Sequence, residues 1–124
     1  MTLPQRPVNS HKAYHAHVYF DEETKRAARA ICDESEERFG LKVGRFHEKP
    51  VGPHPRWSCQ ISFAAKDFEA YLGWLDASRG DLTVFVHPLT GDDLRDHTEF
   101  AYWLGDSVEL KLGIFRKRQS DDSS

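Results

Sequence analysis

The stretch AYHAHVYF, residues 13–20, decides the fold of this 124-residue chain. Alternate side chains of a strand point to opposite faces of a sheet, so His15, His17 and Tyr19 share one face. The other alternates are apolar or aromatic and suit a core. The stretch therefore predicts a strand with one face for a core and one face rich in histidine.

The segments after this strand alternate between helical and strand-like patterns. Acidic residues open the first helical segment, Gly40 closes it, and the loop at 48–56 carries three prolines that neither a helix nor a ladder can include. The predicted order is a strand at 13–20, a helix from 21 to 39, strands at 41–47 and 57–63, a helix at 67–77 and a strand at 82–87.

This βαββαβ order predicts an α+β, ferredoxin-like fold: an antiparallel sheet with both helices on one face and an open second face. After it we expect an extra C-terminal helix, from residues 91–93 to about 102 or 103, and a last strand at 108–115. The single ferredoxin-like domain is predicted to cover 13–116, between a flexible leader at 1–12 and a flexible tail at 117–124.

Three histidines are predicted to meet on the open face. In the usual ferredoxin-like strand order the first strand lies between the third and fourth, so His15 at its start meets His87 at the end of the fourth. His17 lies two residues along, and imidazoles at that spacing can close on one ion. The sequence predicts a metal site; the alternative is that these are solvated or hydrogen-bonded side chains. Phe85 fits either the open face or the core.

The other histidines near the site each have two interpretations. His47 and His54 bracket the proline loop and either reach the site as acid–base groups or face solvent. His97 belongs either to a solvated helix face or to a helix that covers the open face and brings His97 or Glu99 to it.

Charge and composition exclude several function classes. The 17 basic and 20 acidic residues give a net charge of -3 without a basic stripe, which argues against nucleic acid as a partner. No apolar run approaches the roughly 20 residues that cross a bilayer, and the N-terminus lacks a signal-peptide segment, so a cytoplasmic protein without membrane contact is expected. Cys32 and Cys59 are predicted to be small buried residues.

We expect the open face to be covered by a face-to-face homodimer or by the C-terminal helix, the dimer being preferred.

Four motifs stand at fixed spacing: HAHVYF at 15–20, GPHP at 52–55, HPLTGDDLRDHTE at 87–99 and WLG at 103–105. Together they resemble the DOPA 4,5-dioxygenase family of small aromatic ring-cleaving enzymes, over about residues 13–115. The resemblance implies a ferredoxin-like fold, non-haem Fe(II), which another divalent metal can replace in crystals, and extradiol cleavage by O2 of a catechol such as DOPA or a related dihydroxyphenyl compound.

The resemblance also implies roles for the histidines. His15, His17 and His87 are then candidate iron ligands, since imidazoles suit that ion. His54 and His97 are candidate acid–base or substrate-orienting residues, and His47 is a further candidate.

Substrate contacts are expected from Tyr19 and Gln60, and from Arg95 or Arg56, either of which could bind a substrate carboxylate or form a surface salt bridge instead. The common facial triad contains a carboxylate, which Glu99 could supply unless the site uses histidines alone.

Two other functions fit the same pattern. One is a non-catalytic ferredoxin-like module that binds a small ligand or a metal. The other is a metal-independent dimeric ferredoxin-like enzyme whose histidines act as bases.

Overall fold

The computed structural model describes residues 9–113 and 115. Most of the predicted leader and the whole predicted tail at 117–124 lie outside the described residues. The described end of the leader contacts the fold, because the Asn9 side-chain amide donates to the carbonyl of Ala65 at 2.9 Å.

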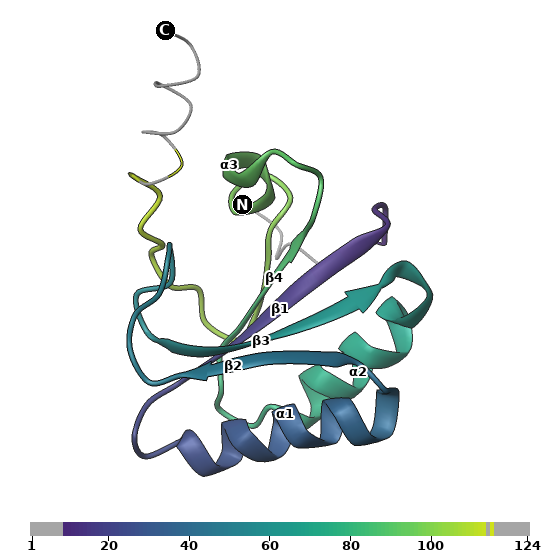
Figure 1. Cartoon of the computed structure of the whole chain (residues 1–124), viewed down its shortest axis with the longest axis vertical. Helices are drawn as coiled ribbons and strands as arrows, with labels where there is room; N and C mark the ends of the chain where they lie inside the picture. Colours follow the sequence, from purple (N-terminus) through teal and green to yellow (C-terminus); the bar gives the residue numbers. More distant parts are fainter. Residues whose placement is uncertain (1–8, 114, 116–124) are drawn as a thin grey trace, which may run out of the picture.

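The chain forms the five-stranded antiparallel sheet and the helices drawn in Figure 1. The elements are β1 (Ala13–Phe20), α1 (Lys25–Phe39), β2 (Lys42–His47), β3 (Trp57–Ala64), a 3-10 turn (Ala65–Asp67), α2 (Phe68–Ser78), β4 (Val84–Pro88), α3 (Asp93–Asp96) and β5 (Tyr102–Leu104). The strand order is β2-β3-β1-β4-β5, with β1 between β3 and β4. The α+β, ferredoxin-like prediction is therefore confirmed.

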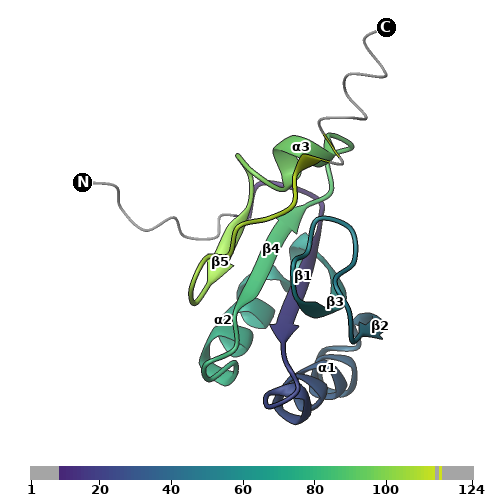
Figure 2. The same ribbon diagram turned by 90° about the vertical axis from the view of Figure 1, so that its left-hand side faces the viewer.

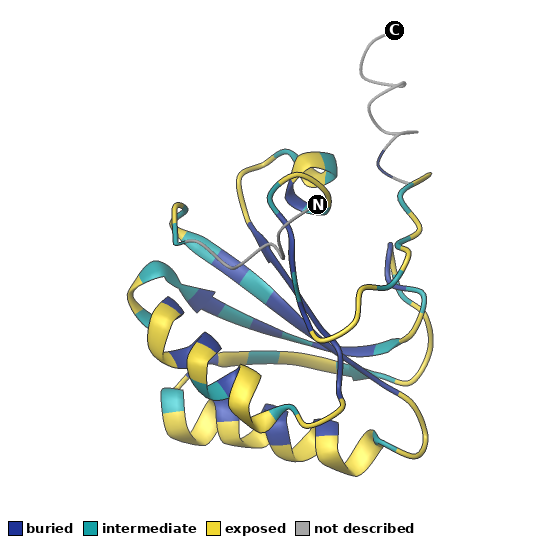
Figure 3. Cartoon of the chain, turned by 180° about the vertical axis from the view of Figure 1, so that it is seen from behind, coloured by how far each residue is buried: buried dark blue, intermediate teal, exposed yellow. Residues whose placement is uncertain are grey.

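Helices α1 and α2 both cover one face of the sheet, and α3 with its flanking loops lies on the other side (Figures 1 and 2). The core lies between the helices and the sheet, where Tyr14, Ala16 and Val18 of β1 are fully buried. They pack in one cluster with Ile31 of α1 and Tyr71 of α2, and Figure 3 shows the buried sides of both helices turned toward the sheet. The apolar alternates of β1 thus hold the two layers together.

Helix α1 begins at Lys25, four residues later than the acidic run suggested. The chain before it forms a tight hydrogen-bonded turn in which Asp21 accepts from the backbone N–H and the hydroxyl of Thr24, both at 2.9 Å. These bonds lower the pKa of the Asp21 carboxyl. Local capping of this kind competes with helix formation at acidic residues.

The register of β1 with its neighbours aligns the polar alternates. His15 pairs with His87 of β4, and His17 pairs with Gln60 of β3. The prediction that His15 and His87 are neighbours on one face is confirmed.

The predicted extra C-terminal helix and strand are present as α3 and β5, but both predicted ranges were wrong. The helix expected to reach residue 102 or 103 ends at Asp96, and Tyr102–Leu104 instead forms β5, with Leu104 opposite Val84 of β4. Tyr102 and Leu104 join the main core, because the free edge of β4 offers both ladder bonds and burial.

The strand expected at 108–115 is absent from the described residues of that stretch. Val108 and Leu110 pack instead against a second cluster formed by Tyr19, Phe85 and Ala101 on the face away from the helices. The backbone N–H of Lys111 donates to the carbonyl of Pro53 at 2.8 Å. The chain therefore covers part of its own open face, and Phe85 belongs to that face.

Among the described residues, none of the helices has the length and apolar character that crossing a membrane would require.

Candidate metal centre and its cavities

His15, His17 and His87 come together on the open face of the sheet. One ring nitrogen from each lies within 4.8 Å of the others. The rings come from two paired strands, β1 and β4, so backbone hydrogen bonds between the strands set their spacing. His17 and His87 are buried, whereas His15 is half-buried.

The orientation of His87 fits a metal ligand. Its Nδ1–H donates to the carbonyl of Pro88 at 2.9 Å, which leaves the lone pair of Nε2 pointing into the cluster. That atom lies 2.9 Å from Nε2 of His17. Two nitrogen ligands bound at about 2.1 Å and at right angles are roughly 3.0 Å apart, so the pair has the spacing of adjacent ligands on one ion. Without an ion, a proton on Nε2 of His17 bridges the two rings.

Burial keeps these imidazoles neutral. Burial, together with the positive charge of neighbouring histidines such as His97, lowers the pKa of His87 to about 3 and that of His54 to about 4. The pKa of His17 falls well below its usual value, and that of His15 is lowered, also chiefly by burial. A neutral imidazole is the form that ligates metals and accepts protons.

This burial predicts acid destabilisation of the metal-free protein. The unfolded chain protonates His54 and His87 near pH 6.5, but the folded protein does so only near 4 and 3. The free energy of unfolding is therefore not reduced by these groups above pH 6.5. It falls as the pH drops from 6.5 toward 4, by up to about 1.4 kcal/mol per pH unit for each group.

Urea denaturation at several pH values measures this effect. His54→Gln removes one of the two groups, so the free energy of unfolding of this variant should depend less steeply on pH. An equal free energy of unfolding at pH 7 and pH 5 would contradict it.

A cavity of about 300 Å³ lies over the cluster. It is lined by His15, His17, His47, Val51, Gly52, Pro53, His54, Ser58, Gln60, His87, Leu89, Asp93 and His97. The structure thus gathers six of the seven histidines and Gln60 around one space, which we call the histidine cavity. Its acidic lining residue is Asp93 and not Glu99.

His97 stands against the metal-ligand candidates from the α3 side. Its ring centroid is 4.1 Å from that of His87 and 4.6 Å from that of Phe115. Its Nδ1–H donates to the carbonyl of Asp93 at 2.7 Å, so Nε2 carries the lone pair. The interpretation in which the segment after β4 covers the open face therefore agrees with the structure.

Asp96 holds that segment in place and was not anticipated from the sequence. It is 2% exposed and accepts from the backbone N–H of Thr90 at 2.9 Å and from the Thr90 hydroxyl at 2.6 Å. The signal in the sequence was an acidic residue directly before His97 and six residues after a threonine in a loop.

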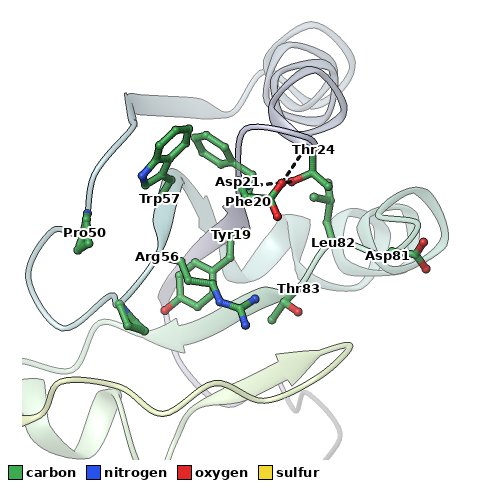
Figure 4. A pocket seen from close by; sticks show the side chains of 11 residues that line it. Tyr19, Phe20, Asp21, Thr24, Pro50, Arg56, Trp57, Asp81, Leu82 and Thr83 are labelled. Carbon is green, nitrogen blue, oxygen red and sulfur yellow. Dashed lines mark hydrogen bonds between the residues drawn. The ribbon is translucent and has the colours of Figure 1, made fainter.

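Tyr19 does not line the histidine cavity itself but contacts His54, which does. Its hydroxyl lies 2.7 Å from Nδ1 of His54, and burial raises the pKa of the phenol, which stays protonated. Its ring lines a second cavity of about 490 Å³ at the end of the sheet (Figure 4).

That second cavity, which we call the arginine cavity, adjoins the first along the 50–56 loop, whose residues line both. It is lined by Tyr19, Phe20, Asp21, Thr24, Pro50, Pro55, Arg56, Trp57, Asp81, Leu82 and Thr83. The positive charge of Arg56 acts on both Tyr19 and Asp21.

Arg95 and Glu99 lie outside both cavities. They form an exposed pair, with Nε of Arg95 3.0 Å from a Glu99 oxygen, and the Arg95 guanidinium stacks 4.6 Å from the Phe100 ring centroid. For Arg95 the surface salt-bridge interpretation therefore describes the structure.

Known proteins resemble this chain over most of its length. The Dopa 4,5-dioxygenase family matches residues 14–114. The DOPA 4,5-dioxygenase of Amanita muscaria is 31% identical over an alignment of 110 residues, and the match covers 82% of this chain and 48% of that enzyme. An uncharacterized 21.2 kDa protein of Botryotinia fuckeliana is 32% identical over an alignment of 117 residues, and the match covers 85% of this chain and 64% of that protein. The chain therefore spans less than two thirds of the length of these curated relatives.

A solved structure shares the whole fold. The crystal structure of a protein from Nostoc punctiforme, described as a "putative dioxygenase", matches with a TM-score of 0.85 and 33% identity. The match covers 92% of this chain and 99% of that chain. Together with the family match over residues 14–114, it means that this chain belongs to the Dopa 4,5-dioxygenase family.

Proposed function

We propose that this chain is a non-haem iron extradiol dioxygenase that opens the ring of a catechol, such as DOPA or a related dihydroxyphenyl compound. The observation that carries the proposal is the group of three neutral imidazoles on paired strands at the base of the histidine cavity. The family match and the Nostoc structure support a dioxygenase.

His15, His17 and His87 are the proposed ligands. A ferrous ion held by three protein ligands has open positions for both catechol oxygens and O2. The three imidazoles are neutral, and His87 is oriented by its bond to Pro88, as ligands of such an ion are. No carboxylate belongs to the cluster of described residues, so a histidine-only set is proposed, with Asp93 rather than Glu99 at the cavity wall.

Proton transfer is proposed for the histidines on either side of the ligands. Nε2 of His97 carries a lone pair, because Nδ1–H is held by Asp93, and this atom can accept the proton of a catechol hydroxyl. His54 lies opposite, with its ring centroid 4.1 Å from that of His17, and is proposed to interact with the second oxygen. His47 and Gln60 line the same cavity and are proposed to orient the ring.

The arginine cavity is the proposed place for a substrate side chain. The histidine cavity, of about 300 Å³, would hold the aromatic ring beside the proposed ligands, and the adjoining cavity holds Arg56. A guanidinium binds a carboxylate with two parallel hydrogen bonds. Arg56 is therefore preferred to Arg95, whose guanidinium is already engaged by Glu99.

A panel of catechols with iron-loaded protein tests the function. We expect a yellow ring-opened product and O2 uptake, and a lower KM for catechols with a carboxylated side chain. Arg56→Gln should raise KM for those substrates by about tenfold, the size of one charge-assisted interaction, and leave simple catechols unaffected. Arg95→Gln is the matched control and should leave KM unchanged for both kinds of catechol.

Iron binding without turnover of any catechol would favour a non-catalytic metal-binding module. Turnover that survives chelation would favour a metal-independent enzyme.

A homodimer in the cytoplasm is also proposed, with O2 and a small aromatic substrate as partners. The cover that the chain gives to its own open face, through Val108 and Leu110, leaves less of that face for a second copy than the sequence suggested.

A further inference from the structure

The hydrogen bond between Tyr19 and His54 joins two buried side chains from distant parts of the chain. Tyr19 is 2% exposed and His54 is 6% exposed, and the hydroxyl oxygen and Nδ1 are 2.7 Å apart. The bond lies at the boundary between the histidine cavity, which His54 lines, and the arginine cavity, which Tyr19 lines.

Both partners are held independently of each other. The Tyr19 ring packs with Phe85 in the second cluster and lies 6.0 Å from the Trp103 ring. His54 is fixed by its own backbone, whose N–H donates to Val51 at 3.0 Å. The fold therefore sets the positions of both Tyr19 and His54, and the contact between them follows from those positions.

The other ring nitrogen of His54 faces the histidine cavity. Among the described residues, every fully buried side-chain nitrogen or oxygen has a hydrogen-bond partner. Nε2 of His54 has no hydrogen-bond partner among the described residues, so it is not fully buried and lies at the surface of the cavity. The ring is close to His17, with 4.1 Å between centroids.

We propose that Tyr19 is a positioning residue that donates its hydroxyl proton to Nδ1 of His54 and thereby places the ring proton of His54 on Nε2. A neutral imidazole carries one proton, so an acceptor at Nδ1 requires N–H at Nε2. His54 then presents a hydrogen-bond donor to the cavity, suited to a substrate oxygen. The inference rests on the proposed function for that role.

The same tautomer keeps His54 out of the metal site. With a proton on Nε2, the nitrogen that faces the cavity has no lone pair for an ion, although its ring touches His17. His54 also lies outside the group of side chains whose ring nitrogens are all within 4.8 Å of one another, which His15, His17 and His87 form. The tautomer and the spacing of the rings therefore agree in leaving His54 as a donor to the cavity and not as a ligand.

Nitrogen NMR of the metal-free protein, labelled with 15N-histidine, tests the tautomer without any need for turnover. We expect the His54 resonances to show an unprotonated Nδ1 and a protonated Nε2, with assignment by their loss in His54→Gln. A protonated Nδ1 or an even mixture in the wild-type protein would overturn the proposal. This result stands whether or not the chain cleaves catechols.

Tyr19→Phe keeps the ring and removes the donor. We expect the His54 signals to move toward a mixture of tautomers and kcat to fall about 10- to 100-fold, with little change in KM. Tyr71→Phe is the matched control, since it removes a buried hydroxyl that bonds Ser35 at 2.9 Å on the helix side of the sheet.

The control should leave the His54 signals and kcat unchanged. Equal losses of kcat in both variants, or unchanged His54 signals in Tyr19→Phe, would mean that the Tyr19 hydroxyl serves stability alone, and the proposal would fail.

Discussion

Replacing His17 with alanine should abolish iron binding and lower the rate of ring cleavage by about a thousandfold or more. His17 is one corner of the triangle of rings, with Nε2 2.9 Å from Nε2 of His87 and its ring 5.8 Å from that of His15. Its loss leaves only two of the three ligands, His15 and His87, on the paired strands β1 and β4. A bound metal supplies several kcal/mol of transition-state stabilisation, and about 4 kcal/mol corresponds to three powers of ten in rate.

The fold should survive this change although His17 is buried. His17 is 5% exposed and does not lie on a solvated face, because the 50–56 loop covers it. Alanine leaves a small cavity among neutral rings, at a cost of about 1 to 2 kcal/mol. His11→Ala is the matched control, as His11 stacks on Phe100 away from the cluster. Metal analysis and rate measurements on both variants test the assignment of His17 as a ligand. One iron per chain in His17→Ala would contradict it.

Replacing Asp96 with alanine should cost about 3 kcal/mol of stability and also reduce activity. The carboxylate accepts two hydrogen bonds from Thr90, at 2.9 and 2.6 Å, and is almost completely buried. Hydrogen bonds to a charged group contribute about 1.5 to 3 kcal/mol each, and truncation leaves the Thr90 donors unsatisfied. His97 follows directly, so its ring loses its fixed place at 4.1 Å from His87. A displacement of about 1 Å can lower a rate about a hundredfold.

Asp92→Ala provides the comparison within the same segment. Asp92 accepts from the backbone N–H of Arg95 at 3.2 Å as the cap of α3, and loss of such a cap costs about 1 kcal/mol. Urea denaturation and kcat of the two variants should therefore differ clearly. If Asp96→Ala is no less stable than Asp92→Ala, the buried carboxylate does not hold the segment.

The position of the three central histidines could be predicted because it depends on short-range rules. Alternation along residues 13–20 assigns His15 and His17 to one face, and the strand order of a βαββαβ chain brings His87 beside His15. Both rules depend on a core that only one register buries, with Tyr14, Ala16 and Val18 on the helix side.

The C-terminal part could not be predicted in the same way. Residues 91–103 carry a helix cap and helical spacing, but the edge of β4 offers Tyr102 and Leu104 more burial as β5 than a helix would. The spacing of residues within a segment does not show that tertiary contacts favour a different structure for it. The stretch after residue 107 resembled a strand because of Val108 and Leu110, which in the structure cover the open face without pairing.

The contact of His54 with Tyr19 lies beyond local rules as well. The two residues are 35 positions apart, and His54 sits in a proline-rich loop without periodicity. The loop path depends on contacts such as the Val51–His54 bridge and the bond from Lys111 to Pro53. The sequence placed Tyr19 on the correct face but did not indicate its partner.

Anomalous diffraction at the iron edge, from crystals grown with Fe(II) without oxygen, tests the metal centre most directly. The account predicts one peak per chain, within about 2.2 Å of a ring nitrogen from each of His15, His17 and His87, and with Nε2 of His54 outside the coordination sphere. The absence of a peak, or a peak held by other side chains, would contradict it.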